Sequence, residues 1–200
     1  MFIYILLAIL YAKFKGYRIK PILKDYSLYP LAVAELTYLF LQANVFMGNY
    51  RYIGYASFFK TLYLYTLIVP IVVHRLYKTG FIGSLLVMTG SMMNRFVMSQ
   101  NGGKMPVYPT LSKFTGYFSE APIGTVDHIH VMGNEATRYK ILTDYIDVGY
   151  TILSIGDVLI HLFIFIVVLN TIKENNKNIL KTNQMQEGKA KHGKYSTDHD

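Results

Sequence analysis

The sequence contains no cysteine and no tryptophan, and only 16% of its residues are charged. The lack of cysteine excludes disulfide scaffolds, thiolate metal sites and enzymes with a cysteine nucleophile. Soluble domains carry about 25% charged residues, so the low charge argues against a soluble enzyme. Hydrophobic residues make up 52% of the 200 positions, and the mean hydropathy is +0.26. This composition favours an all-α protein that lies in a lipid bilayer.

Five apolar stretches have the length, or nearly the length, that a helix needs to cross about 30 Å of hydrocarbon. They are Met1–Ala12, Tyr29–Met47, Ala56–Val73, Gly80–Met98 and Tyr150–Ile172. The first is short, and four spans would remain without it. The sequence therefore predicts a polytopic transmembrane helix bundle of about five spans.

The formal net charge of +8 would indicate a nucleic-acid partner in a soluble protein. Here the basic residues instead gather between the apolar stretches, at 13–25, at 74–79 and after residue 172. Short cytoplasmic loops carry such an excess of Lys and Arg. We therefore expect the N-terminus outside, the C-terminus in the cytoplasm and no nucleic acid as a partner.

The predicted transmembrane domain covers residues 1–172 and includes one long outer loop at 100–140. The Gly, Pro, Ser and Thr content of this loop indicates irregular structure, with a short helix near 135–144. Residues 173–200 are polar and predict a cytoplasmic tail that is largely disordered.

Polar residues in the last two spans are predicted to lie at one depth. Asn94 follows Lys78 by 16 residues, and Asp157 precedes Lys173 by 16 residues, about 24 Å along a helix in each case. Because the two helices are antiparallel, Asn94, Arg95 and Asp157 should share a layer near the outer surface, with an Arg95–Asp157 ion pair. Two interpretations remain open: a polar clasp between helices, or a site of binding or reaction.

Ser154, Asp157 and His161 are spaced i, i+3 and i+7, which places them on one face of the last span. They cannot form a Ser-His-Asp triad, because Ser and His would be about 10 Å apart along a straight helix. We expect a polar stripe that faces the bundle interior.

The outer loop contains Asp127, His128 and His130 in a D-H-x-H pattern. Histidine and carboxylate can bind metals, but this spacing matches no closed zinc site. A solvated loop is the favoured interpretation, and we predict neither a metal nor a cofactor.

Asn101, Gly102 and Gly103 follow the fourth span, where two glycines suit a helix C-cap or a turn that faces a ligand. They begin an N-G-G-K-M-P stretch at 101–106, which is followed by L-T-D at 142–144 and S-I-G-D at 154–157. These motifs resemble a family of small bacterial multi-pass membrane proteins of unknown function. The resemblance covers about the last two-thirds of the chain. It implies the bacterial plasma membrane and brings no activity.

The sequence also resembles the lipoprotein signal peptidases, which are aspartic enzymes with four spans. The motifs concerned are G-S-M-M-N-R at 90–95, T-D-Y-I-D at 143–147 and L-S-I-G-D at 153–157. This resemblance implies that Asp144 and Asp157 are catalytic carboxylates and that Arg95 supports them. The chain departs from the family by having Asn94 where the motif has an aspartate.

The specific functional hypothesis is an aspartic-type membrane-embedded peptidase or hydrolase near the outer face, acting on a lipid-linked or membrane-peptide substrate. Its catalytic residues would be Asp144 and Asp157, with supporting or substrate-binding roles for Asn94, Arg95, Asn101, Gly102, Gly103, Ser154 and His161. One alternative is a carrier or small-ligand binder with a cavity lined by Asp157, Glu35 and Gln42. Another is a non-catalytic structural or regulatory partner. The sequence leaves open whether the protein is an enzyme.

Overall fold

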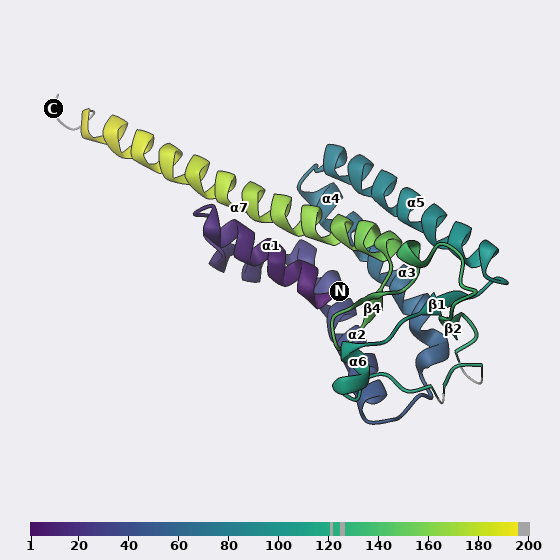
Figure 1. Cartoon of the computed structure of the whole chain (residues 1–200). Coiled ribbons are helices and arrows are strands. Elements are labelled where there is room, and N and C mark those ends of the chain that lie inside the picture. The colour runs from purple at the N-terminus through teal and green to yellow at the C-terminus, as the bar shows by residue number, and fades with distance from the viewer. Residues whose placement is uncertain (121, 125–126, 196–200) are drawn as a thin grey trace.

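The computed structural model describes residues 1–120, 122–124 and 127–195, and these are mostly helical (Figure 1). The α-helices are α1 Phe2–Phe14, α2 Tyr29–Phe46, α3 Ala56–Thr66, α4 Ile68–Val73, α5 Tyr77–Gln100, α6 Leu111–Phe114 and α7 Ile155–Tyr195. Short 3-10 helices lie at η1 Lys20–Lys24, η2 Tyr26–Leu28, η3 Ile53–Tyr55 and η4 Lys140–Leu142. Four short strands accompany them: β1 Met105–Val107, β2 His130–Met132, β3 Ile146–Asp147 and β4 Ile152–Leu153. The all-α prediction therefore holds for the bundle but not for the outer loop.

Helix α7 is the centre of the bundle, with α5 and α1 packed against different sides of it (Figure 1). Glycines let α5 and α7 approach closely. A Cβ on Gly90 would lie 2.3 Å from the carbonyl oxygen of Gly156, and one on Gly83 would lie 1.8 Å from the ring of Phe163. Small residues at such contacts are typical of helices packed within membranes.

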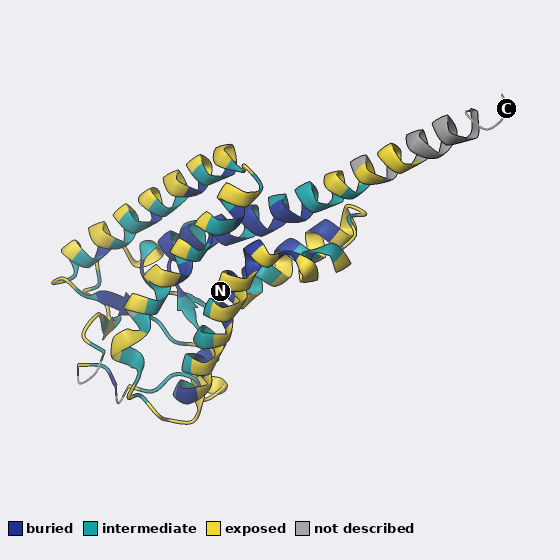
Figure 2. Cartoon of the chain, turned by 180° about the vertical axis from the view of Figure 1, so that it is seen from behind, coloured by how far each residue is buried: buried dark blue, intermediate teal, exposed yellow. Residues whose placement is uncertain are grey.

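Within the described part of the chain, two helices are long and apolar enough to cross a membrane, Tyr77–Gln100 and Ile155–Gln186 within α7. Shorter apolar helices lie at Phe2–Phe14 and Phe58–Val73. Exposed positions cover the outer faces of the bundle, whereas the buried ones concentrate on α7 (Figure 2).

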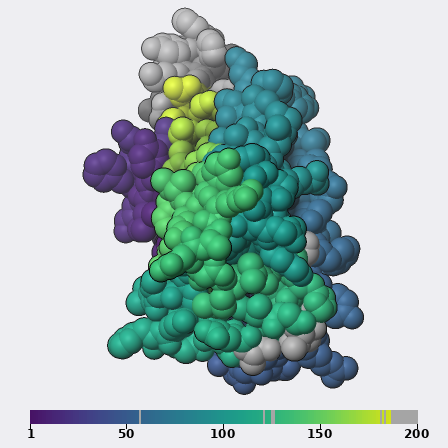
Figure 3. All heavy atoms as spheres, turned by 45° about the vertical axis from the view of Figure 1, so that its right-hand side comes forward, coloured from purple at the N-terminus to yellow at the C-terminus, as the bar shows by residue number. Residues whose placement is uncertain are grey.

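The loop predicted at 100–140 and the residues that follow it up to 153 form a folded unit, which we call the cap and define as residues 101–153. Strand β1 pairs in parallel with β2, and Val107 also bridges to Asp144, while β3 and β4 form an antiparallel pair. A 3-10 turn at η4 takes the place of the short helix expected near 135–144. Side-chain hydrogen bonds hold these short segments of the cap together. The Asp147 carboxylate accepts from the backbone N–H groups of Thr110, Ser112 and Gly149. Figure 3 shows the cap as the lower end of the molecule.

At the opposite end, α7 continues as a helix to Tyr195, whereas the sequence predicted a largely disordered tail over 173–200. Residues 196–200 lie outside the described residues. This part of the chain is rich in Lys, Gln, Glu and Met, which are good helix formers. Its first turns are also held in place, because Asn176 donates to the carbonyl of Arg18 at 3.0 Å and accepts from its N–H at 2.8 Å.

Candidate functional site

Asp157, in the first turn of α7, is the centre of a buried polar cluster, with 6% of its surface exposed. Its Oδ1 lies 2.7 Å from Lys60 Nζ of α3 and accepts from Asn94 Nδ2 of α5 at 3.3 Å. Ser154 caps the helix, since its Oγ accepts from the Asp157 N–H at 2.9 Å and also donates to Asn94 Oδ1 at 2.8 Å. The cluster therefore connects α3, α5 and α7.

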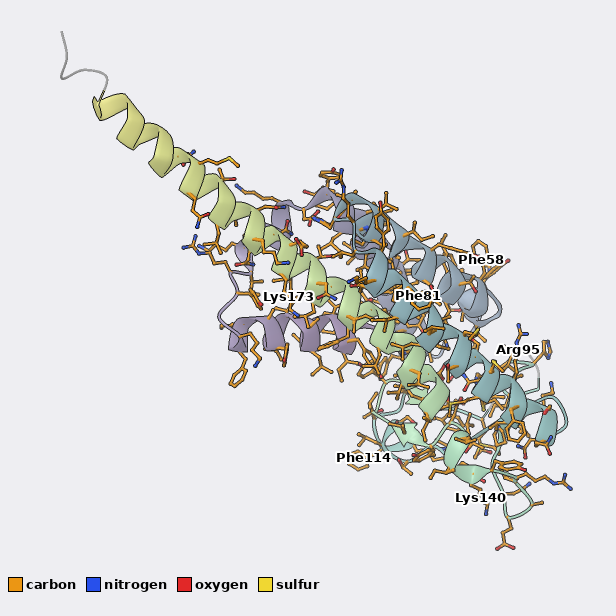
Figure 4. All side chains as sticks on the ribbon, turned by 90° about the horizontal axis from the view of Figure 1, so that it is seen from above. Phe58, Phe81, Arg95, Phe114, Lys140 and Lys173 are labelled. Carbon is orange, nitrogen blue, oxygen red and sulfur yellow. The ribbon has the colours of Figure 1, made fainter. Side chains whose placement is uncertain are left out.

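The expected Arg95–Asp157 ion pair is wrong. Lys60 is the partner of Asp157, and Arg95 is exposed and points away from α7 (Figure 4). One residue along an α-helix is a rotation of about 100°. Because Asn94 faces Asp157, its neighbour Arg95 must face elsewhere. Asn94 and Asp157 lie at the same level along the bundle, but a common level does not fix the direction of a neighbouring side chain.

Asp144 belongs to the cap and is held there by β1. Its N–H donates to the Pro106 carbonyl at 3.1 Å, and its carbonyl accepts from the Tyr108 N–H at 2.8 Å. On the other side of β1, Met105 pairs with His130 of β2. The M-P-V strand thus lies between the segments that carry His130 and Asp144, and it brings their side chains together.

His130 connects two carboxylates. Its Nδ1 lies 2.7 Å from Asp127 Oδ2, and its Nε2 lies 3.4 Å from Asp144 Oδ2. Burial opposes protonation of His130, but the hydrogen bonds and charges of Asp127 and Asp144 outweigh it and raise the pKa of His130 to about 9. His128, by contrast, is exposed. Among the described residues no group of three His, Asp or Glu side chains could hold a metal ion.

The two carboxylates named from the sequence, Asp144 and Asp157, influence each other electrostatically. Burial raises the pKa of Asp144, the hydrogen bond from His130 lowers it, and the negative charge of Asp157 raises it further. Asp144 is 4% exposed, and its Oδ1 has no hydrogen-bond partner among the described residues. A buried carboxyl oxygen without a partner is costly in a purely structural residue.

Asn101 joins the cap to α5. Its Nδ2 donates to the carbonyls of Val97 at 2.9 Å and Arg138 at 3.1 Å, and its Oδ1 accepts from the Arg138 N–H at 3.0 Å. Gly102 and Gly103 both have positive φ, at 66° and 79°. These contacts fit the C-cap interpretation, with a structural role for the three residues.

Polar groups also lie deeper in the bundle. The Tyr63 hydroxyl donates to Glu35 Oε2 at 2.5 Å, and Gln42 Nε2 donates to the Tyr150 carbonyl at 3.5 Å. His161 is 4% exposed, and its ring contacts that of Tyr4 at a tilt of 53°, with ring centroids 5.1 Å apart. Both His161 ring nitrogens and Glu35 Oε1 have no partner within the described part of the chain.

Sequence reasoning gave no site role to Lys60 or His130. Lys60 lies near the start of the apolar stretch Ala56–Val73, and a charge within such a stretch indicates a partner because burying it alone is costly. His130 could not be placed, because its contact with Asp144 depends on β1, and three residues are too few to show a strand pattern.

Residues 20–169 match DUF5317, a family of unknown function. The chain is also 33% identical to an uncharacterised protein of Thermotoga maritima over 89 residues. This matched stretch covers 42% of the chain. That stretch spans about half, 49%, of the relative's length. No solved structure matches the chain.

Proposed function

Because the chain belongs to the DUF5317 family of unknown function, its activity must be argued from its geometry, and we propose an aspartic-type membrane-embedded hydrolase. The observation that carries the proposal is the pair Asp144 and Asp157, one from the cap and one from the bundle, in contrasting environments. Such contrast separates an acid from a base. The setting we propose is a multi-pass protein of the bacterial plasma membrane.

Helix α2 supports membrane insertion. It buries Glu35, Gln42 and Asn44, while Leu36 and Phe40 are 67% and 57% exposed. This inverted arrangement is unfavourable in water and suits a helix with lipid around it and polar groups inside. With α1, α3–α4, α5 and α7 it gives five spans. The lysines near the C-terminal end of α7 favour N-terminus outside and C-terminus inside.

The proposed chemistry uses one oxygen of each carboxylate. On Asp157, Lys60 and Asn94 both bind Oδ1, whereas Oδ2 accepts, from the residues that the structure describes, only a 3.4 Å hydrogen bond from the Ser154 N–H. On Asp144, Oδ1 is the spare atom. Ionised Asp157 takes a proton from water as the water oxygen bonds to the substrate carbonyl carbon. Protonated Asp144 donates its proton to the carbonyl oxygen.

The intermediate then collapses. Asp157 passes its proton to the leaving nitrogen as the carbon–nitrogen bond breaks, and Asp144 recovers the hydroxyl proton as the carbonyl re-forms. His130 is a positioning residue for Asp144, and Lys60 takes the place that the resemblance gave to Arg95. A surface hollow of about 300 Å³, lined by Tyr108, Lys140, Ile141 and Tyr145, flanks the segment that carries Asp144. It offers room for a peptide or lipid-linked group.

The test incubates membrane vesicles from cells that express the full chain in ¹⁸O-labelled water. Hydrolysis leaves one ¹⁸O atom in a carboxyl product, which mass spectrometry detects without knowledge of the substrate. We expect labelled products with the wild type and with Glu135→Gln, an exposed cap control. They should be absent with Asp144→Asn and Asp157→Asn at normal protein levels. Equal labelling in all four would contradict the proposal, and loss of the Asp157→Asn protein alone would favour a structural clasp.

The unpaired atoms of Glu35 and His161 favour a second candidate, a carrier or binder of a small polar ligand in the bundle interior. The chemistry at Glu35 Oε1 suits a small cation. Ammonium, sodium and potassium chloride should then raise the melting temperature of the purified protein to different extents. Glu35→Gln should abolish these differences, whereas identical shifts in both proteins would rule this candidate out.

A further inference from the structure

The cap exposes large apolar side chains although it lies outside the predicted spans. Helix α6 is the extreme case: Phe114 is 91% exposed and Leu111 is 47% exposed. A phenylalanine so open to water is unfavourable, since burying such a side chain is worth about 1.5–3 kcal/mol. No described residue of the chain buries the Phe114 side chain, so we ask whether the lipid bilayer does.

Three contacts fix the level of α6 along the bundle. The ring of Tyr117, just after α6, lies 4.9 Å from the ring of Phe46 at the end of α2. Thr115 donates to the Gly149 carbonyl at 2.5 Å, and Gln42 of α2 reaches the carbonyl of the adjacent Tyr150. Helix α6 therefore lies beside the last turns of α2, level with the outer end of that helix.

The apolar surface of α2 continues onto α6. Phe40, Phe46 and Met47 are 57%, 46% and 72% exposed along α2 and its end. In Figure 4, Phe114 projects sideways from the cap on the side of α1, whereas Lys140 lies at the far end of the cap. The exposed ring thus extends the lateral surface of the bundle instead of facing away from it.

From this continuity we infer that α6 is an interfacial anchor that inserts Phe114 and Leu111 into the outer leaflet of the bilayer. The inference rests on the proposed membrane topology and is independent of the hydrolase. Lys113, between the two apolar residues, is exposed and suits the headgroup level, where basic side chains flank inserted apolar ones. The anchor would hold the cap, and with it Asp144, against the end of the bundle.

The absence of tryptophan makes a direct test available, because any inserted tryptophan is the only one. Three single variants are compared in vesicles of phosphatidylglycerol and phosphatidylethanolamine, with and without brominated acyl chains that quench tryptophan. Phe114→Trp reports on the anchor, Phe81→Trp on the lipid face of α5, and Ile141→Trp on the far side of the cap. Phe81 and Ile141 are 67% and 66% exposed, so the two control positions match each other in accessibility.

We expect several-fold stronger quenching for Phe114→Trp and Phe81→Trp than for Ile141→Trp, with a blue-shifted emission for the first two. Quenching of Phe81→Trp without quenching of Phe114→Trp would overturn the anchor and leave the topology intact. Absence of quenching for Phe81→Trp would contradict the topology itself. A blue shift of Phe114→Trp that depends on protein concentration and resists brominated lipid would assign the surface to a second copy, and would also overturn the anchor.

Discussion

At the scale of single residues, the structure shows how charged side chains inside the protein obtain partners. Lys60 and Asp157 come from segments 97 positions apart, and without Lys60 the buried carboxylate of Asp157 would have no charged partner among the described residues. Within the cap, the partly buried His130 obtains two partners, the carboxylates of Asp127 and Asp144. The sequence could identify these residues as needing partners, but it could not decide among several partners at similar depth.

Removing Lys60 should therefore destabilise the protein. We expect Lys60→Met to lower the free energy of unfolding by about 2–3 kcal/mol, below the about 3–5 kcal/mol of a fully buried pair because Lys60 is 38% exposed. The measurement is unfolding in mixed micelles with increasing sodium dodecyl sulfate. Lys113→Met breaks the exposed 3.6 Å pair with Glu120 and an exposed cation–π contact with Phe118, and should cost about 0–1 kcal/mol. A loss for Lys60→Met no larger than for this control would contradict the assigned pairing.

The cap should lose stability at alkaline pH. The pKa of His130 is raised to about 9, so protonation of His130 favours the folded cap. Its contribution is fully present below the unfolded value of 6.5 and is lost as pH rises through about 9. Amide hydrogen exchange at β1 and β2, corrected for the intrinsic rate, should reveal greater opening from pH 7 to 9.5. His130→Gln should remove this pH dependence, and an unchanged profile would refute the assignment.

At the scale of elements, the long helices were the most predictable part of the chain. The stretches expected at 80–98 and 150–172 correspond to α5 and the first part of α7, since long apolar runs carry a strong signal. The cap was not predictable, because its strands have two or three residues and depend on Asn101 and Asp147 as side-chain clamps. The packing of one helix against another was also not predictable, because the α5–α7 contact depends on individual glycines such as Gly83 and Gly90.

The contact between α5 and α7 can be tested at Gly90. Gly90→Ala places a Cβ 2.3 Å from the Gly156 carbonyl oxygen, which is backbone and cannot move away cheaply. We expect a lower melting temperature and a weaker hydrogen bond between Asn94 and Asp157, because the two helices are pushed apart. Gly80→Ala, in the same helix, meets only the flexible side chain of Ile71 at 3.2 Å and should change little. Equal effects of the two substitutions would show that close approach at Gly90 is unimportant.

At the scale of the whole molecule, the proposed topology places the cap outside and the end of α7 inside. The chain has no cysteine, so a single introduced thiol reports its own side. Lys140→Cys in the cap should react with a membrane-impermeant maleimide in intact cells. Lys177→Cys, which is exposed on α7, should react only after permeabilisation. Labelling of both in intact cells would contradict the proposed orientation.

The central claim is that the cap and the bundle supply one carboxylate each to a single coupled site. Infrared titration of the protonated carboxyl band of Asp144, identified by its loss in Asp144→Asn, measures this coupling most directly. We predict a pKa well above the ordinary aspartate value of 3.8, and a lower pKa in Asp157→Asn because the repelling negative charge is gone. An ordinary pKa, or one that Asp157→Asn leaves unchanged, would contradict the account.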